Sequence, residues 1–202
     1  MDVIGMAGRE YAGALMESGD DLIARARHGD EDAFRVIFQR YTRPVIRFIF
    51  YMVNNRALAE DLAQETFVRA YTNLAGLRDE AKLSTWLFGI ARNVTREAIR
   101  ANRHDQHRVE FEQVQEVSDN TPSPAGQLLD KELTDVVQRA LGKLDEDKRL
   151  VFTLKVYQQR SYEEIAEITG FSIPKLRNDL YRARAEMRTR LSRYLHPRGG
   201  RS

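Results

Sequence analysis

Apolar side chains recur along this chain at intervals of three and four residues, and that spacing constrains its fold more than any other feature. Phe34, Ile37, Phe38 and Tyr41 follow the i, i+3, i+4, i+7 pattern of one helix face. The same spacing returns across much of residues 133–191. The strict alternation typical of half-buried strands is nearly absent, and proline and glycine are sparse. The sequence therefore predicts an all-α fold.

Local signals in the first half of the chain predict where its helices begin and end. Pro44 is expected to open a second helical run, because proline is tolerated in a first turn. Asn54 and Asn55 predict a break. Ser84 is a candidate N-cap for a further helix that reaches about Ala101.

Residues 105–130 differ from the rest in composition. They hold six acidic residues against one base, Arg108, and they contain Pro122 and Pro124, which disfavour helix. We interpret this segment as a flexible acidic linker between two small helical domains. Residues 109–128 could extend to ~70 Å. Two DNA elements one and a half turns apart are separated by ~50 Å, so a linker of this length would let the two domains bind the same face of one DNA duplex.

The predicted organisation follows from these breaks. It comprises a flexible N-terminal segment (1–19), a first helical domain (20–104), the linker (105–129), a second helical domain (130–196) and a tail (197–202).

Composition limits the classes of function. The chain has 202 residues, no cysteine and a formal net charge of only +2, so disulfides, thiolate zinc sites and cysteine nucleophiles are excluded. Its apolar run at residues 48–53 is too short to span a bilayer, and the first residues lack the apolar core of a signal peptide. We expect a cytoplasmic protein without membrane insertion.

Residues 161–184 have the parts of a helix-turn-helix. Ser161 and Glu164 form a capping box, Gly170 supplies the turn, and Ser172 can cap a longer helix. From residue 173 to the end there are nine bases and two acids. The outer face of this second helix offers Lys175, Arg177, Asn178, Tyr181, Arg182 and Arg184. This pattern favours a helix that reads the major groove of DNA over an ordinary solvated helix.

Two further surfaces carry weaker signals. Arg92, Arg96, Arg100 and Arg103 form one basic stripe on a helix that follows a loop with Arg78, Asp79 and Lys82. The stripe suits nucleic-acid phosphates, although a solvated basic face would look similar. An earlier helix presents Asp61, Gln64 and Glu65, which is compatible with a protein docking face or with plain solvation.

Three segments together carry a resemblance to a known family. They are AEDLAQETFVRAY at residues 59–71, STWLFGIARN at residues 84–93, and SYEEIA at residues 161–166 followed by YRARA at residues 181–185. In this order, with a linker between the second and third, they resemble the extracytoplasmic-function (ECF) sigma factors of bacterial RNA polymerase. The resemblance covers about residues 20–195.

The resemblance implies a non-enzymatic function with no cofactor and no metal: binding core RNA polymerase and directing promoter-specific initiation. It implies as partners the β′ clamp and β flap regions of core polymerase, promoter DNA and, as for many group members, an anti-sigma factor. Residues 20–104 would be sigma region 2 and residues 130–196 would be sigma region 4.

The resemblance also implies a role for each candidate residue. Core polymerase would contact Asp61, Gln64, Glu65, Phe67 and Arg69. The −10 promoter element would be melted and held by Arg78, Asp79, Lys82, Ser84, Thr85, Trp86, Arg92, Asn93, Arg96 and Arg100. The −35 element would be read by Lys175, Arg177, Asn178, Tyr181, Arg182 and Arg184.

Two segments depart from the common family pattern. The recognition helix starts SIPKLRND at residues 172–179, so Asp179 stands where a base is usual. The loop RDEAKL at residues 78–83 replaces the more common Arg-Gly-Asp-Ser-Ser-Phe. Both departures fall where promoter contacts are expected, so the promoter preference is not readable from the sequence.

Two other classes of function fit less of the sequence. A stand-alone helix-turn-helix regulator would explain residues 161–184 but would leave residues 59–71 and 84–93 without a role. A metal-dependent nuclease needs carboxylates aimed at one point, and the four histidines (His28, His104, His107 and His196) form no ligand set. We therefore expect no catalytic site.

Overall fold

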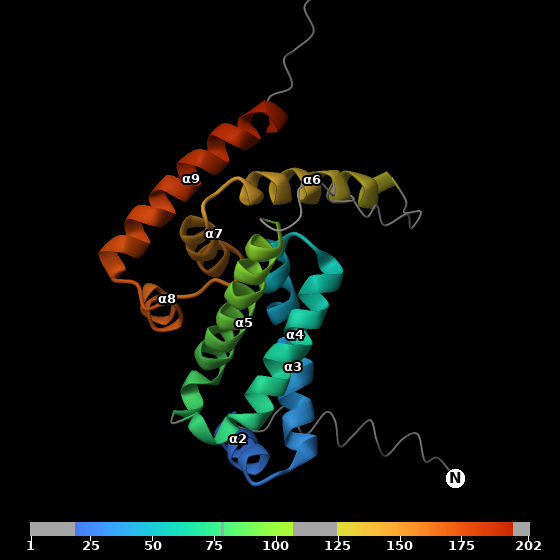
Figure 1. Cartoon of the computed structure of the whole chain (residues 1–202), viewed down its shortest axis with the longest axis vertical. Coiled ribbons are helices and arrows are strands. Elements are labelled where there is room, and N and C mark those ends of the chain that lie inside the picture. The colour runs from blue at the N-terminus through green and yellow to red at the C-terminus, as the bar shows by residue number, and fades with distance from the viewer. Residues whose placement is uncertain (1–18, 78, 107–124, 196–202) are drawn as a thin grey trace, which may run out of the picture.

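A computed structural model describes residues 19–77, 79–106 and 125–195, and every regular element in these ranges is helical (Figure 1). The first half of the chain forms α2 (Gly19–Arg27), α3 (Glu31–Val53), α4 (Arg56–Thr72), the 3₁₀ turns η1 (Leu74–Gly76) and η2 (Glu80–Lys82), and α5 (Leu83–Gln106). The second half forms α6 (Ala125–Gly142), α7 (Glu146–Phe152), the π-helical turn η3 (Thr153–Tyr157), α8 (Tyr162–Thr169) and α9 (Ile173–Leu195). The predicted all-α fold is confirmed.

Helix α3 is the centre of the N-terminal domain, because α2, α4 and α5 all pack against it. Val45 and Phe48 are fully buried on its inner face. Phe48 meets Phe88 of α5 edge to face, with ring centroids 5.5 Å apart. At the other end of the helix, α2 inserts Leu22 and Ile23 into a second apolar cluster. The long helix therefore links two cores.

Pro44 lies inside α3, so the prediction that it opens a separate helix is wrong. An interior proline removes one backbone hydrogen bond and costs ~3 kcal/mol or more. The apolar face nevertheless continues across it, with Val36 and Ile37 buried before it and Val45 and Phe48 after it. Each such side chain contributes about 1.5–3 kcal/mol when fully buried. Tertiary packing therefore outweighs the local cost.

The predicted break between the second and third helical runs is confirmed at two adjacent asparagines. Asn54 ends α3 in the left-handed conformation with φ 54°, and its N–H donates to the Phe50 carbonyl at 2.8 Å. Asn55 then caps α4, because its side-chain oxygen accepts from the Leu58 N–H at 3.0 Å. Asparagine suits both positions, since it tolerates the left-handed region and caps helices well.

The start of α5 differs from the sequence prediction. The turn η2 leads directly into α5 at Leu83, so Ser84 lies in the first turn and is not the N-cap. Its hydroxyl instead accepts a hydrogen bond from Arg160 of the C-terminal domain. The helix also continues beyond the predicted end near Ala101, as far as Gln106.

The C-terminal domain has the local geometry predicted for a helix-turn-helix. The Glu164 N–H donates to the Ser161 hydroxyl at 3.1 Å, and the Ser161 N–H donates to the Glu164 carboxylate at 2.7 Å. Gly170 makes the turn with φ 73°, a conformation that glycine adopts without strain. Ser172 accepts from the Lys175 N–H at 3.4 Å at the start of α9. The capping box and the turn are confirmed.

Both helices that flank the predicted linker extend into it. Helix α5 ends at Gln106 and α6 begins at Ala125, whereas the linker was expected to span residues 105–129. Its remaining part, residues 107–124, lies outside the described residues, as do residues 1–18 and the tail from residue 196.

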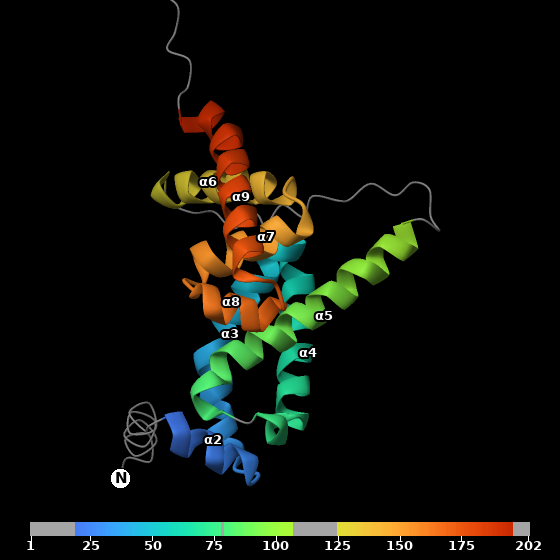
Figure 2. The same cartoon turned by 90° about the vertical axis from the view of Figure 1, so that its left-hand side faces the viewer.

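The C-terminal domain lies against α3 and α5 of the N-terminal domain, and the apolar core continues from one to the other (Figures 1 and 2). Tyr51 of α3 stacks on Tyr157 of η3, with ring centroids 4.1 Å apart and an interplanar angle of 22°. Arg149 of α7 donates to the carbonyl of Met52 at 2.7 Å. The two domains therefore meet in a closed arrangement.

We expect this junction to weaken at alkaline pH. Burial, with a smaller contribution from Tyr51, raises the pKa of Tyr157 from 10.0 to about 12. The folded protein therefore favours the protonated phenol. The contribution of the protonated Tyr157 to the stability of the folded protein is therefore fully present below pH 10 and is lost as pH rises toward 12.

The ultraviolet absorbance of tyrosinate measures this titration. The difference between the curves of the parent protein and Tyr157→Phe should show one phenol that ionises near pH 12. A difference curve centred on pH 10 would contradict the burial argument.

Candidate polymerase and nucleic-acid interfaces

The outer face of α4 presents the acidic residues predicted to bind a protein. Asp61, Gln64 and Glu65 are exposed. Arg69 links this face to α5, because its guanidinium lies 2.7 Å from Glu65 and 2.8 Å from Glu97. Hydrogen bonds to those two carboxylates raise the pKa of Arg69. Arg69 thus ties Glu65 of α4 to Glu97 of α5.

Exposed apolar side chains that the sequence did not assign to this interface lie on α4 beside these acids and on the neighbouring helix α3. Phe38, Val68 and Tyr71 are 39%, 58% and 47% exposed. Phe67 was predicted to contact a partner, but it is buried at 3% exposure and packs edge to face on Phe38. Val68 and Tyr71 follow Gln64 at i+4 and i+7, so helical spacing alone could have placed them on the same face of α4. We call Asp61, Gln64, Glu65, Val68 and Tyr71 the α4 face.

The loop before α5 and the first turn of α5 place several predicted −10 residues close together. Asp79 is exposed, and its side chain accepts from the Ala81 N–H at 3.1 Å. Lys82 is exposed too, and its ammonium lies 2.7 Å from Glu167 of α8. Arg78 lies outside the described residues.

Two of the residues predicted to bind the −10 element, Thr85 and Trp86, pack into the N-terminal domain. Thr85 is buried, at 9% exposure. Trp86 is half-buried and packs against both apolar clusters of the N-terminal domain. A rigid core therefore supports the first turn of α5.

The predicted basic edge of α5 is present as a continuous row. Arg92 is half-buried and donates to Asn93 at 3.1 Å. Burial, and then the positive charges of Arg96 and Arg100, lower the pKa of Arg92. Arg96 pairs with Glu146 of α7 at 2.9 Å, whereas Arg100 is exposed. The side chain of Arg103, expected in the same row, lies outside the described residues.

The outer face of α9 carries the remaining candidates. Tyr181 is 75% exposed, and the other polar side chains of this face are exposed as well: Arg177, Asn178, Arg182 and Arg184. They lie on α9, which follows α8 across the turn at Gly170 (Figure 1).

Lys175 differs from these five because acidic side chains already surround it. Its ammonium lies 2.5 Å from Asp179 and 3.0 Å from Asp147 of α7. It also lies 4.2 Å above the Phe171 ring. Although partial burial opposes the charge, hydrogen bonds to the two carboxylates raise the pKa of Lys175. The unusual Asp179 therefore neutralises a base of its own helix.

Other kinds of site find little support in the described residues. Residues 19–77, 79–106 and 125–195 hold no group of three metal-ligating side chains. Within the same ranges, no helix has the length and apolar character needed to cross a membrane. The ring nitrogen Nδ1 of His28 lies within hydrogen-bond distance of the Ala24 carbonyl oxygen, at 2.7 Å, one turn earlier in the chain. The side chains of His104, His107 and His196 lie outside the described residues.

Comparison with known proteins decides the family. Residues 37–104 match the family model of sigma-70 region 2, and residues 134–187 match that of sigma-70 region 4. The chain is 32% identical over 179 residues to the ECF RNA polymerase sigma factor SigW of Bacillus subtilis strain 168, covering 84% of this chain and 94% of SigW. The chain belongs to the ECF sigma factors. It directs transcription initiation by RNA polymerase and is not an enzyme.

Other relatives agree with this assignment. The ECF sigma-E factor of Escherichia coli K12 is 30% identical over 174 residues, or 81% of this chain and 88% of the relative. Among solved structures, CnrH bound to the cytosolic domain of CnrY aligns with a TM-score of 0.65 and 26% identity, covering 87% of this chain and 98% of CnrH. RpoE of Bartonella quintana bound to the anti-sigma factor NepR aligns with a TM-score of 0.63 and 25% identity. The alignment covers 79% of this chain and 96% of RpoE.

The pairing of Lys175 leads to a prediction about DNA affinity at different salt concentrations. Each phosphate that a base neutralises contributes a slope of about −0.9 to log K against log salt. Because Asp147 and Asp179 already neutralise Lys175, Lys175→Gln should leave that slope nearly unchanged on duplex DNA. Arg182→Gln, which removes an exposed base from the same helix, should reduce it by about 1. Equal reductions for both variants would show that Lys175 is available to phosphate.

Proposed function

We propose that this ECF sigma factor divides its work among three surfaces: the α4 face binds core polymerase, the start of α5 binds −10 DNA, and α9 reads −35 DNA. The observation that carries the proposal is the exposed face of α9, where Arg177, Asn178 and Tyr181 lie together beyond a capped turn. Arginine can pair with guanine edges and asparagine with adenine edges in the major groove. Arg182 and Arg184 then suit phosphates.

For core polymerase, the proposed contact is between the α4 face and the β′ clamp. The combination of exposed acids with Val68 and Tyr71 supports it, because protein interfaces join an apolar centre to a polar rim. Arg69 orients Glu65 through their ion pair. Phe67 supports the surface from below, through its contact with Phe38.

For the −10 element, the proposed contact runs from the loop at residues 78–82 along the arginine row of α5. Lys82, Arg92, Arg96 and Arg100 would follow the phosphates of a separated strand. Unstacking a base costs a few kcal/mol, and the pocket and phosphate contacts offset this cost. Trp86 and Thr85 hold the first turn of α5 in the core beneath that path.

For the −35 element, Lys175 is proposed to position the recognition helix and not to contact a base. Its pair with Asp147 fastens the first turn of α9 to α7, and its pair with Asp179 lies within α9. The acidic linker, at residues 105–129 in the sequence interpretation, is proposed to lie along the polymerase and to span the distance between the two promoter elements. The C-terminal domain would meet the β flap.

The proposal extends to partners and location. RpoE and CnrH were solved in complex with NepR and CnrY, and this supports an anti-sigma partner for the present chain. We propose the cytoplasm as the site of action, because promoter DNA and RNA polymerase are found there.

Transcription with purified core polymerase tests the function directly. Adding the protein to core polymerase and genomic DNA of the source bacterium should produce initiation at a discrete subset of promoters, mapped by run-off. A stand-alone regulator would instead bind duplex DNA equally well with and without core. The absence of initiation on every fragment would refute the sigma role of these surfaces.

The docking surface has its own test. Asp61→Lys should weaken binding to core polymerase by roughly tenfold or more, since a reversed charge at an interface introduces repulsion worth about 1.4 kcal/mol or more. Asp135→Lys, which reverses another exposed acid, on α6 and outside the α4 face, is the matched control and should leave the affinity unchanged. Unaltered core affinity of Asp61→Lys in a fluorescence titration would remove this residue from the interface.

A further inference from the structure

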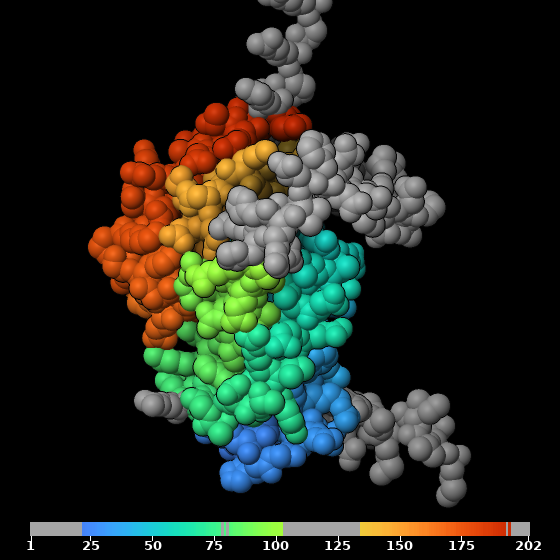
Figure 3. Space-filling view, viewed as in Figure 1, coloured from blue at the N-terminus to red at the C-terminus, as the bar shows by residue number. Residues whose placement is uncertain are grey.

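One exposed base of the recognition helix lies against an aromatic ring of the preceding helix. The central guanidinium carbon of Arg177 lies over the ring of Tyr162, 5.6 Å from the ring centroid. Tyr162 is the first residue of α8, and Arg177 lies near the start of α9. Figure 3 shows the surfaces of these two helices side by side. The contact therefore joins the two helices of the helix-turn-helix through a residue that is proposed to bind DNA.

Several contacts restrict the Tyr162 ring. The capping box formed by Ser161 and Glu164 fixes the first turn of α8. The ring is half-buried and packs against the apolar core. The ammonium of Lys155 lies 4.7 Å from the centroid of the same ring, and it donates to the Arg160 carbonyl at 2.9 Å. Arg177 is therefore in contact with a ring whose own place is set by α8, by the core and by η3.

The ring contacts Arg177 without neutralising it. In a cation–π contact the positive charge is attracted to the face of the ring, and no carboxylate is needed. Among the residues that the structure describes, no carboxylate forms an ion pair with Arg177, and no acceptor takes a hydrogen bond from its guanidinium. The five N–H donors of this group thus remain available to a ligand.

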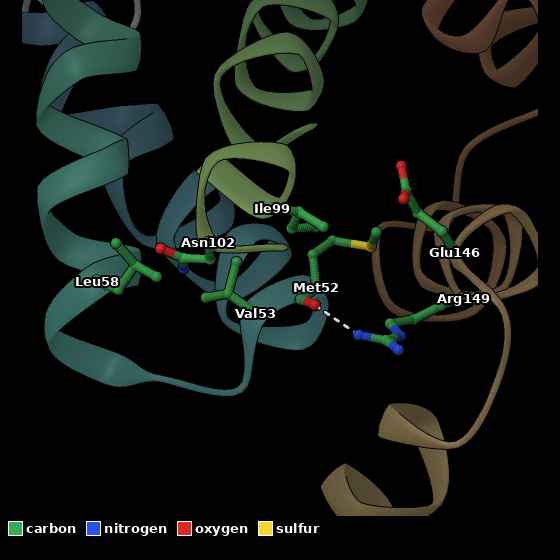
Figure 4. Close-up of a pocket in the computed structure, with 7 residues that line it drawn as sticks. All are labelled: Met52, Val53, Leu58, Ile99, Asn102, Glu146 and Arg149. Carbon is green, nitrogen blue, oxygen red and sulfur yellow. Dashed lines mark hydrogen bonds between the residues drawn. The ribbon is translucent and has the colours of Figure 1, made fainter. Parts of the chain in front are cut away.

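Two other bases of the C-terminal domain are held in ways that prevent DNA binding. Arg149, beside a cavity of about 210 Å³ at the domain junction, donates to the Met52 carbonyl at 2.7 Å (Figure 4) and to two further carbonyls at 3.0 and 3.1 Å. Lys175 lies over the Phe171 ring, but two carboxylates also pair with it. Arg149 thus gives its donors to the protein, and Lys175 is neutralised. Arg177 differs from both.

An arginine that is already oriented binds a base edge with a smaller loss of entropy. A long side chain loses rotamer freedom when a contact fixes it, and a group held near its bound geometry loses less. Bidentate pairing with the O6 and N7 atoms of guanine also depends on how the planar guanidinium is turned. A ring that restricts Arg177 in the free protein should therefore favour base reading more than it favours phosphate binding.

We propose that Tyr162 is a positioning residue for −35 recognition, whose ring orients Arg177 toward the base edges of the major groove and leaves its charge and its N–H donors to the DNA. This inference rests on the proposed role of α9 in reading the −35 element. It gives Tyr162 no contact with DNA of its own, because the face of the ring, and not the hydroxyl, holds the arginine.

The test uses the full-length sigma factor bound to core polymerase and a promoter mapped by run-off. The measured quantity is the ratio of the affinities for two promoter fragments that differ only in the −35 element, one intact and one scrambled. Binding to the −10 element is common to both fragments, so the ratio reports −35 recognition alone. Tyr162→Leu removes the face of the ring but keeps an apolar side chain, whereas Tyr162→Phe keeps the ring. Tyr162→Leu is also combined with Arg177→Ala.

Tyr162→Leu should lower the ratio by roughly two- to fivefold, the range expected for a cation–π contact at an exposed site. Tyr162→Phe should keep the ratio of the parent. Arg177→Ala should lower the ratio by roughly fivefold or more, as expected for a lost bidentate base contact. In that background Tyr162→Leu should have no further effect, because the partner of the ring is gone.

Phe171→Leu is the matched control, because it removes the other ring of the helix-turn-helix that contacts a base of α9. The base over that ring is Lys175, which is not proposed to contact DNA. The ratio should therefore stay close to that of the parent. A loss as large as that of Tyr162→Leu would mean that any change of ring in this region has the same effect, and it would overturn the inference.

Three other results would also overturn it. If Arg177→Ala lowers the ratio and Tyr162→Leu does not, the ring does not position Arg177. If Tyr162→Leu causes the same loss with and without Arg177, the loss comes from the fold or from another contact. If Tyr162→Phe loses as much as Tyr162→Leu, the hydroxyl is responsible. The proposed role of α9 fails by a different result, an unchanged ratio in Arg177→Ala.

Discussion

One continuous apolar face on α3 is the constraint on which the rest of the molecule depends. The helix runs for 23 residues, and its buried side chains lie on both sides of Pro44. Its length lets one element carry the core with α4 and α5 at one end and the cluster with α2 at the other. The same helix ends at the domain junction, where Tyr51 stacks on Tyr157 and the Met52 carbonyl accepts from Arg149. The C-terminal domain therefore docks on a surface that the N-terminal core holds rigid.

The sequence predicted those parts of the structure that depend on neighbouring residues. The capping box at Ser161, the turn at Gly170 and the pair Asn54–Asn55 each satisfy backbone groups within a few residues, so local pattern is sufficient. The exposed face of α9 was predictable for the same reason, because helical spacing fixes which residues share a face. Pro44 was misinterpreted because burial on both sides of it outweighs its local cost, and Ser84 was misinterpreted because η2 leads directly into α5 one residue earlier.

The candidate site was predictable in its composition but not in the state of its charges. Counting bases on the recognition helix treats Lys175 and Arg182 as equal. The structure separates them, because Asp147, 28 residues away in the sequence, and Asp179 both bind the Lys175 ammonium. The pair with Asp179 follows helical i,i+4 spacing within α9, but the pair with Asp147 requires the fold to bring α7 and α9 together, and no pattern within one helix reveals it. The departure at Asp179 thus has a structural reason within this chain.

The same argument extends to the domain junction. A protein that must bind DNA carries rows of like charge that repel one another when DNA is absent, and a nearby carboxylate lowers that cost. The Arg96–Glu146 side chains are only 28% and 21% exposed, whereas those of Lys82–Glu167 are 52% and 46% exposed. Salt and water screen the more exposed pair more strongly. The pair between α5 and α7 therefore holds the two domains together more strongly than the pair between Lys82 and Glu167 does.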